Sequence, residues 1–242
     1  MCFRYSRKVK VIILAGGLGT RISEETSDKP KPMVLIGTKP ILWHVMNIYA
    51  RQGYSDFVIA TGYKSDVVQS WVNQLSEPWN VVAFDTGLET QTGGRIKKCI
   101  EAHPSDSYFI TYGDGLGNIN LSSLVATHKN QGKLATVTAV RPPARFGVLE
   151  IENGIVTHFG EKTHVDAGWI NGGFFVIEKE VVETIEDDTT LFETGPLPKL
   201  ARQNELAAYQ HQGFWQPMDT LRERDLLISL AQNSTPPWLN ID

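Results

Sequence analysis

A glycine-rich segment with three cations close behind it is the part of the sequence best suited to chemistry. It reads LAGGLGTR (residues 14–21) and is followed by KPKPM (29–33). Glycines directly after a strand let backbone N–H groups approach phosphate oxygens. Arginine grips such oxygens with two parallel hydrogen bonds, and lysine supplies a compact charge. We interpret Arg21, Lys29 and Lys31 as cations of a polyphosphate site; the alternative is a tight turn with solvated charges.

Two widespread phosphate-binding patterns do not fit this segment. Gly17-Leu18-Gly19 begins a GxGxxG pattern, but Ile22 stands where the third glycine should be. The GxxxxGK[ST] pattern does not occur in the sequence. The dinucleotide fingerprint and the P-loop are therefore excluded.

Asp114 is the first of two acidic residues that could hold a metal ion. It lies between two glycines at the end of an apolar run, in YFITYGDG (108–115). A carboxylate facing a triphosphate suits Mg²⁺, which takes oxygen ligands and keeps several waters and phosphates. Asp219, in QPMDT (216–220), is the candidate second ligand. Alternatively, Asp114 only forms a turn and Asp219 only caps the final helix.

Strands and helices alternate in the first half of the chain, and this alternation must position those groups. It predicts an α/β fold with a doubly wound, mostly parallel sheet. Loops that follow parallel strands share one edge of the sheet, where ligands bind. The glycine loop, the Thr86-Gly87 turn and the Gly113–Gly115 turn should therefore meet in one cleft. The apolar patterns place strands at 9–14, 57–62, 81–87, 108–115 and 133–140, and helices at 41–53, 65–75, 92–102 and 121–132.

The second half of the chain does not continue the regular alternation of strands and helices. Asn153-Gly154 between alternating apolar residues predicts a hairpin, and a strand follows at 170–177. Residues 179–206 should be mainly helical, and 221–231 should form a closing amphipathic helix. We expect a single domain over 1–242, in which residues 9–140 form one half and residues 141–242 form the other.

Composition excludes several classes of protein. The 242 residues carry 23 Lys and Arg against 27 Asp and Glu, a net charge of -4, which argues against a nucleic-acid partner. No apolar run approaches the roughly 20 residues of a membrane helix. The opening MCFRYSRKVK is too short and too basic for a signal peptide. With only Cys2 and Cys99, no disulfide framework is expected, so we predict a cytoplasmic protein without a membrane partner.

LAGGLGTR with KPKPM resembles the signature of the sugar-1-phosphate nucleotidylyltransferases. Further motifs are most similar to the cytidylyltransferase branch of that family. The resemblance implies a Rossmann-like fold with a β-rich sugar-binding wall formed by 141–242. It also implies Mg²⁺-dependent transfer of a nucleotidyl group from CTP to glucose 1-phosphate, giving CDP-glucose and pyrophosphate. The motifs are ILWHVM, GYK (62–64), DTG (85–87), TGGR (92–95), YGDG, ARFG (144–147), INGGFF (170–175) and GFWQPMDT (213–220).

The resemblance also implies a set of site residues. Asp114 and Asp219 match the pair that binds Mg²⁺. Three cations match groups that act on the phosphates: Arg21, Lys31 and Lys162. The residues expected to contact substrates are Leu14, Ala15, Gly16, Gly17, Gly19 and Thr20 in the loop and Thr92, Gly93, Gly94 and Arg95 at the nucleotide. Glu161, Asn171 and Gly172 are expected at the sugar phosphate, and Gly113 and Gly147 complete the set.

Two departures from the family pattern leave alternatives open. Thr163 replaces the usual proline after Glu161-Lys162, and the stretch between Trp71 and Trp79 is shorter than in the cytidylyltransferases. In those enzymes the longer segment helps to bind nucleotide across a subunit contact, so base selectivity and homo-oligomer formation stay open. One alternative is the same chemistry with UTP, dTTP or another phosphorylated acceptor. Another is a non-catalytic nucleotide-sugar sensor, which would be free to lose one of the charged site residues.

Overall fold

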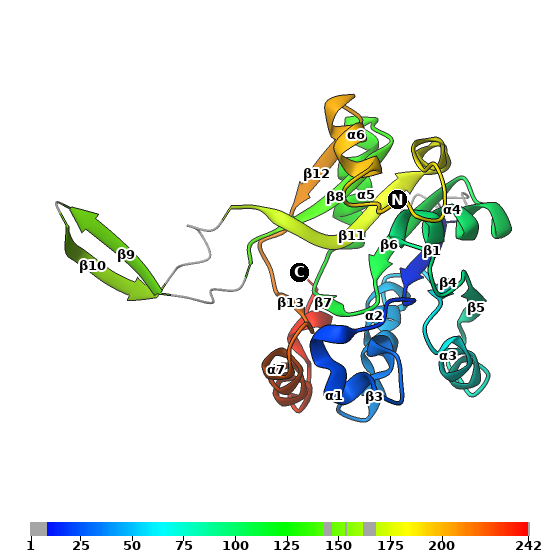
Figure 1. Ribbon diagram of the computed structural model, residues 1–242, viewed down its shortest axis with the longest axis horizontal. Coiled ribbons are helices and arrows are strands. Elements are labelled where there is room, and N and C mark those ends of the chain that lie inside the picture. Colours follow the sequence, from blue (N-terminus) through cyan, green and yellow to red (C-terminus); the bar gives the residue numbers. More distant parts are fainter. Residues whose placement is uncertain (1–8, 143–146, 153, 162–167, 242) are drawn as a thin grey trace, which may run out of the picture.

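A seven-stranded sheet forms the centre of the molecule (Figure 1). The computed structural model describes residues 9–142, 147–152, 154–161 and 168–241. The strand order is β12-β8-β11-β6-β1-β4-β5, and only β11 runs antiparallel to its neighbours. The mostly parallel α/β sheet predicted from the sequence is thereby confirmed. The strands are β1 (Val9–Leu14), β4 (Asp56–Thr61), β5 (Asn80–Asp85), β6 (Ser107–Tyr112), β8 (Ala135–Val140), β11 (Ile170–Glu178) and β12 (Leu206–Gln210).

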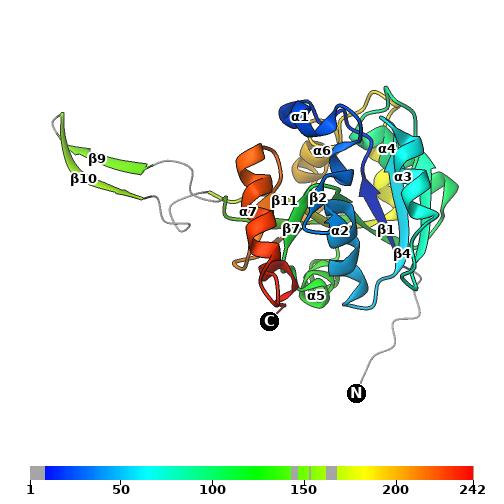
Figure 2. The same cartoon turned by 90° about the horizontal axis from the view of Figure 1, so that it is seen from below.

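Helices cover both faces of this sheet (Figures 1 and 2). Side chains alternate along β1, so Val11 and Ile13 join one apolar core while Ile12 and Leu14 join the other. The first core packs mainly against α2, and the second against α4 and α6. The α-helices are α1 (Ser23–Thr26), α2 (Ile41–Ala50), α3 (Ser65–Val72), α4 (Thr92–Ala102), α5 (Leu121–Gln131), α6 (Pro196–Arg202) and α7 (Leu221–Ala231).

The ends of the helices follow local capping chemistry. Asn120 Oδ1 accepts a 2.9 Å hydrogen bond from Ser123 N and so caps the start of α5. Thr220 and Glu223 form a capping box on α7. Thr220 therefore caps α7. Asp219 lies one position before the cap, and its carboxylate contacts Lys31. The capping alternative for Asp219 is wrong.

The second half of the chain adds smaller elements beside the sheet. The predicted hairpin is present as β9 (Gly147–Glu152) and β10 (Ile155–Glu161), and it projects away from the sheet in both views (Figures 1 and 2). Asn153 of its turn lies outside the described residues. The segment predicted to be mainly helical holds the 3-10 helix η3 (Lys179–Thr184) and α6.

Two short ribbons and three 3-10 helices were not predicted. Strand β7 (Gly115–Gly117) pairs with β13 (Trp215–Pro217), and β2 (Leu35–Ile36) pairs with β3 (Lys39–Pro40). Two 3-10 helices, η1 (Thr20–Ile22) and η2 (Lys31–Met33), flank α1, and a third, η4 (Pro237–Leu239), follows α7. Within the ranges that the structure describes, no helix is long and apolar enough to cross a membrane.

Candidate active site

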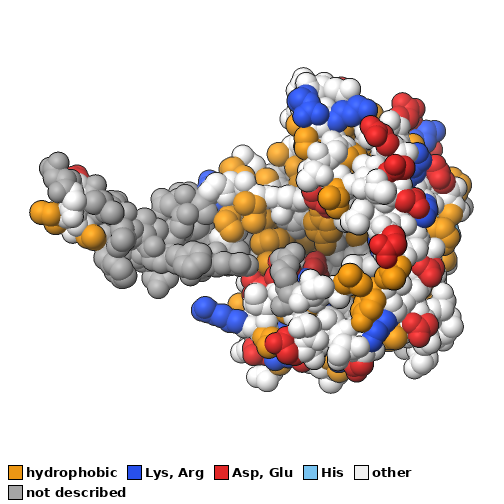
Figure 3. All heavy atoms as spheres, in the orientation of Figure 1, with side chains coloured by type: hydrophobic (Ala, Val, Ile, Leu, Met, Phe, Trp, Pro, Cys, Tyr) orange, Lys and Arg blue, Asp and Glu red, His pale blue; other side chains and the backbone are white. Residues whose placement is uncertain are grey.

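A cleft of about 1080 Å³ opens at the carboxyl ends of the central strands. Figure 3 shows one face of the molecule hollowed near its centre. The glycine loop and the turn after β6 both line the cleft, as predicted. The Thr86-Gly87 turn does not line the cleft. In this segment the first residue that lines it is Leu88. Fourteen of the predicted site residues line the cleft: Leu14, Ala15, Gly16, Gly17, Gly19, Thr20, Lys31, Thr92, Arg95, Gly113, Asp114, Asn171, Gly172 and Asp219.

The glycine loop is held through its carbonyl oxygens. Gly16 O accepts hydrogen bonds from Arg95 and from Tyr63 N, and Gly19 O accepts one from Thr26 Oγ1 at 3.2 Å. Gly19 has a φ of 64°, a left-handed conformation that favours glycine. Among the described residues, none accepts a hydrogen bond from the N–H groups of residues 16–19. Those N–H groups are left for an anion in the cleft.

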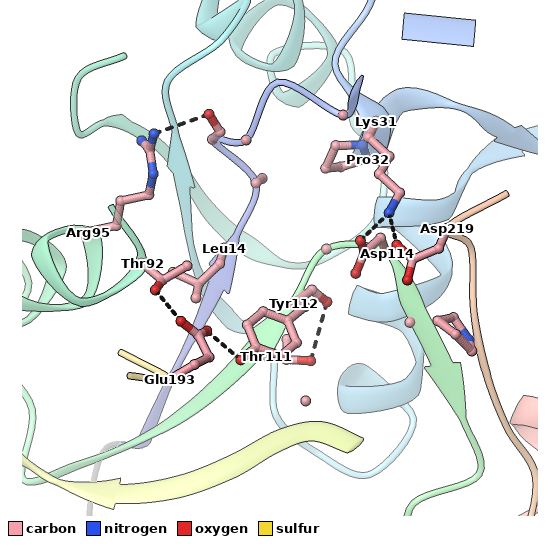
Figure 4. A pocket seen from close by; sticks show the side chains of 18 of the residues that line it. Leu14, Lys31, Pro32, Thr92, Arg95, Thr111, Tyr112, Asp114, Glu193 and Asp219 are labelled. Atoms are coloured by element: carbon pink, nitrogen blue, oxygen red, sulfur yellow. Dashed lines mark hydrogen bonds and ion pairs between the residues drawn. The ribbon is translucent and has the colours of Figure 1, made fainter. Parts of the chain in front are cut away.

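Lys31 joins two carboxylates from distant parts of the chain (Figure 4). Its Nζ donates to Asp114 Oδ2 at 2.6 Å and to Asp219 Oδ1 at 2.7 Å. Burial by itself would lower the pKa of Lys31, but the two carboxylates outweigh it and raise that pKa above its ordinary value. The Lys31 amine is therefore a protonated ammonium, and both acids contact one cation.

The two acids fit Mg²⁺ as it is used with nucleotides. Asp114 follows β6 and Asp219 precedes α7, yet both reach the ammonium of Lys31, so the position between them already accommodates a cation. No group of three or more acidic, histidine or cysteine side chains that could hold a metal occurs in the described part of the chain. Mg²⁺ is commonly bound by one or two carboxylates together with waters and substrate phosphates.

Arg95 is buried beneath the glycine loop, with 4% of its surface exposed. Its guanidinium donates to Thr61 O at 2.7 Å, Thr86 Oγ1 at 2.5 Å, Gly16 O at 3.1 Å and Leu88 O at 3.3 Å. These four bonds tie the loop after β1 to the ends of β4 and β5. Arg95 thus holds the glycine loop in place through hydrogen bonds. Its contact with the nucleotide stays a prediction.

The two glycines at the start of α4 face another part of the chain. Gly93 N donates to Thr190 O at 2.9 Å. A Cβ on Gly93 would lie 2.7 Å from Thr190 O, and one on Gly94 would lie 2.7 Å from Asp188 Cα. The glycines are explained by this close approach of backbone to backbone, and neither lines the cleft.

The far wall of the cleft comes from β11 and β13. Asn171 and Gly172 lie on it, and Trp215 Nε1 donates to Gly172 O at 2.8 Å. Gly147 and Glu161 pair with each other at the ends of β9 and β10, and their predicted contacts with substrate stay predictions. Arg21 lies in η1, but its side chain and the whole of Lys162 are outside the described residues, so these roles stay predictions.

The cleft also contains residues that the sequence analysis missed, of which Glu193 and Tyr112 join its two sides. Glu193 lines the cleft and accepts hydrogen bonds from Thr92 and Tyr112, as Figure 4 shows. Tyr112 is the last residue of β6, and its place directly before the Gly113–Gly115 turn was a signal for it. No pattern in the sequence distinguishes Glu193 from the other acids between 178 and 193.

A parallel α/β sheet that gathers a glycine loop, a lysine and two carboxylates beyond its strand ends is the architecture of a nucleotide-binding protein. Comparison with known proteins narrows this class. A family model described as nucleotidyl transferase matches residues 10–222. The chain belongs to this nucleotidyl transferase family and is a nucleotidyltransferase.

Curated relatives give the subgroup that the chain resembles. It is 46% identical to the glucose-1-phosphate cytidylyltransferase of Salmonella typhi, over 95% of this chain and 98% of the relative. It is 41% identical to a probable glucose-1-phosphate cytidylyltransferase of Bacillus subtilis, over 88% of this chain and 92% of the relative. The predicted similarity to the cytidylyltransferase branch is confirmed.

Solved structures share the fold at lower identity. HddC from Yersinia pseudotuberculosis, complexed with GMP-PN, superposes with a TM-score of 0.69 at 24% identity, covering 91% of this chain and 98% of that one. The inositol-1-phosphate CTP transferase of T. maritima superposes with a TM-score of 0.68 at 16% identity, covering 96% and 99%. These similarities support the fold.

Proposed function

We propose that the protein transfers a cytidylyl group from CTP to glucose 1-phosphate, giving CDP-glucose and pyrophosphate with Mg²⁺ as cofactor. The observation that carries the proposal is the contact of Lys31 with Asp114 and Asp219 beside the glycine loop. The choice of CTP and glucose 1-phosphate is supported by the 46% identity to a glucose-1-phosphate cytidylyltransferase over nearly the full length of both chains.

The proposed reaction needs no nucleophile from the protein. An oxygen of the sugar phosphate attacks the α-phosphorus of the nucleotide, the bond from that phosphorus to the bridging oxygen breaks, and pyrophosphate leaves with the electron pair. Catalysis then consists mainly of positioning and charge stabilisation. Bound Mg²⁺ would neutralise charge on the triphosphate and would be held by Asp114 and Asp219.

The chain's own groups divide this work between two sides of the cleft. On one side, the free N–H groups of residues 16–19 bind triphosphate oxygens. Lys31 lies where the two substrates meet and offsets the repulsion between their phosphates. On the other side, Asn171 and Gly172 hold the sugar phosphate. The resemblance to the family assigns Glu161 and Lys162 to the same substrate. Arg21 adds a second cation at the triphosphate.

The test is a pyrophosphate-release panel of CTP, UTP, dTTP and GTP against several sugar 1-phosphates, with and without Mg²⁺. We expect CTP with glucose 1-phosphate to react fastest, and only with the metal. Faster release with UTP or dTTP would assign the same chemistry to another nucleotide. No release from any pair, with tight binding of a nucleotide sugar, would favour the sensor.

A matched pair of variants tests the metal ligands. Asp114→Asn should raise the Mg²⁺ concentration needed for half-maximal rate by at least about tenfold, since a carboxylate ligand is lost. Asp225→Asn makes the same chemical change on the exposed face of α7 and should leave the curve unchanged. An unchanged curve for Asp114→Asn would contradict its role as a ligand.

A further inference from the structure

We infer that Glu193 is a positioning residue that couples the nucleotide side of the cleft to its sugar-phosphate side. The inference rests on the proposed function for the naming of the two sides. Glu193 lies in the segment between η3 and α6, and nothing in its local sequence assigns it a role.

Both carboxylate oxygens of Glu193 accept a hydrogen bond from a cleft residue (Figure 4). Oε2 accepts from Thr92 Oγ1 at 2.6 Å, and Oε1 accepts from Tyr112 Oη at 2.6 Å. Thr92 is the first residue of α4, and Tyr112 is the last residue of β6. One carboxylate therefore connects the start of a helix on the nucleotide side to the strand that leads into Asp114.

The connection continues to the opposite wall. Asn171 Nδ2 donates to Tyr112 Oη at 3.3 Å. Because the Tyr112 hydroxyl has a single proton, donating it to Glu193 leaves its lone pairs to accept from Asn171. A carboxylate accepts hydrogen bonds and donates none, so both hydroxyls donate to Glu193. The direction of each bond in the series is fixed by Glu193.

The Tyr112 ring packs closely against the opposite wall. Gly173 approaches the ring so closely that a Cβ there would lie 2.5 Å from Cδ2 of Tyr112. Gly173 N is in turn bonded to Asn171 Oδ1 at 2.8 Å. A shift of Tyr112 would therefore shift the wall that carries Asn171 and Gly172, whereas a shift of Thr92 would move the start of α4.

Glutamine is an informative replacement for Glu193. Its amide has one oxygen acceptor and an NH₂ group that only donates. Both Thr92 and Tyr112 donate to the glutamate, whereas Glu193→Gln can accept from only one of the two hydroxyls. The other bond can persist only if that hydroxyl reverses and accepts from the NH₂ group, so the arrangement of the wild type is lost. The side chain keeps its size, which separates the loss of the connection from the loss of packing.

The first measurement needs no substrate. The melting temperature is measured for Thr92→Val, for Tyr112→Phe and for the double variant, which together form a double-mutant cycle. The same three variants are then made and measured in the Glu193→Gln background. We expect the double variant to lower the melting temperature by clearly less than the sum of the two single shifts, because both remove bonds to one carboxylate. In Glu193→Gln the two shifts should become additive. Additive shifts in the wild-type background would overturn the inference.

The second measurement separates the two sides of the cleft. Thr92→Val should raise KM for CTP about fivefold, roughly the effect of one lost net hydrogen bond, with KM for glucose 1-phosphate nearly unchanged. Tyr112→Phe should do the reverse, and Glu193→Gln should raise both. Thr184→Val and Tyr108→Phe make the same chemical changes away from the cleft and should leave both KM values unchanged.

The outcomes distinguish a failure of the inference about Glu193 from a failure of the proposed function. If Glu193→Gln lowers the melting temperature and leaves both KM values unchanged, Glu193 is only a packing residue and the inference is wrong. If the wild type releases no pyrophosphate from any pair of substrates, the proposed function fails, and the melting-temperature cycle still decides whether Glu193 couples Thr92 to Tyr112.

Discussion

Lys31 and Asp114 stand 83 positions apart in the sequence, and their side chains meet at 2.6 Å in the cleft. Asp219 approaches the same ammonium at 2.7 Å. The lysine thus occupies the position between the two carboxylates that a divalent cation would take. A metal and the ammonium would compete for these acids unless a phosphate gives Lys31 another partner.

This competition predicts that removing the lysine improves metal binding in the absence of nucleotide. Lys31→Met should bind Mn²⁺ about tenfold more tightly than the wild type, because a hydrogen bond between charged groups contributes about 1.5–3 kcal/mol. The affinity is measured by titration of the free Mn²⁺ signal in electron paramagnetic resonance. The same variant should lose most of its turnover, by roughly 10²–10³-fold, since a cation at the reacting phosphates is lost.

Lys29→Met is the matched control for that experiment. Lys29 lies two positions earlier and pairs with Glu25 at 3.8 Å, away from the two acids. Its Mn²⁺ affinity should equal that of the wild type. Equal affinity in Lys31→Met and the wild type would mean that the ammonium does not compete with the metal.

Neighbouring glycines of the loop should respond differently to alanine. A Cβ on Gly16 would overlap the Arg95 guanidinium, which is held by four hydrogen bonds, whereas a Cβ on Gly17 would have no atom within 4 Å. Gly16→Ala should therefore lower the free energy of unfolding by about 1–3 kcal/mol. Gly17→Ala should stay within about 0.5 kcal/mol of the wild type. Urea unfolding measures both, and equal losses would contradict the packing described for Gly16.

Replacement of Arg95 should destabilise the fold as well as the loop. Arg95→Met would remove the guanidinium's hydrogen bonds to the carbonyl oxygens of Thr61, Gly16 and Leu88 from a buried position. We expect a loss of about 2–4 kcal/mol in the free energy of unfolding. Arg51→Met, at an exposed position after α2, is the control and should change it by less than about 0.5 kcal/mol. A loss for Arg95→Met as small as that of the control would show that these bonds contribute little.

Alkaline pH should destabilise the protein through Tyr49. Its side chain is fully buried against Phe109 and Phe174, and burial raises its pKa well above the usual value. The unfolded chain then releases the tyrosine proton first, so stability is complete below about pH 10 and falls as pH rises further. Tyr49→Phe should reduce this decline by up to about 1.4 kcal/mol per pH unit above pH 10. Unfolding measured from pH 8 to 11 checks it; identical slopes would contradict the prediction.

Most of the fold was predictable because its signals are local. The β-branched run of β1, the apolar spacing of α2 and the cap at Asn120 all depend on residues within a few positions of one another. The short ribbon of β7 and β13 was missed because it joins segments about a hundred residues apart. The edge strand β12 was missed because its short sequence carries no clear alternation of apolar and polar residues.

The sequence by itself determined most of the strands and helices of the first half, the family, and the candidate acids and cations, because residue type and local spacing carry that information. Only the tertiary structure decided which of these groups touch. It brought Asp219 to Lys31, turned Arg95 beneath the loop, and placed Glu193 between Thr92 and Tyr112. The physical reason is that such contacts depend on where the sheet and its crossovers return the chain, and no short stretch of sequence encodes that position.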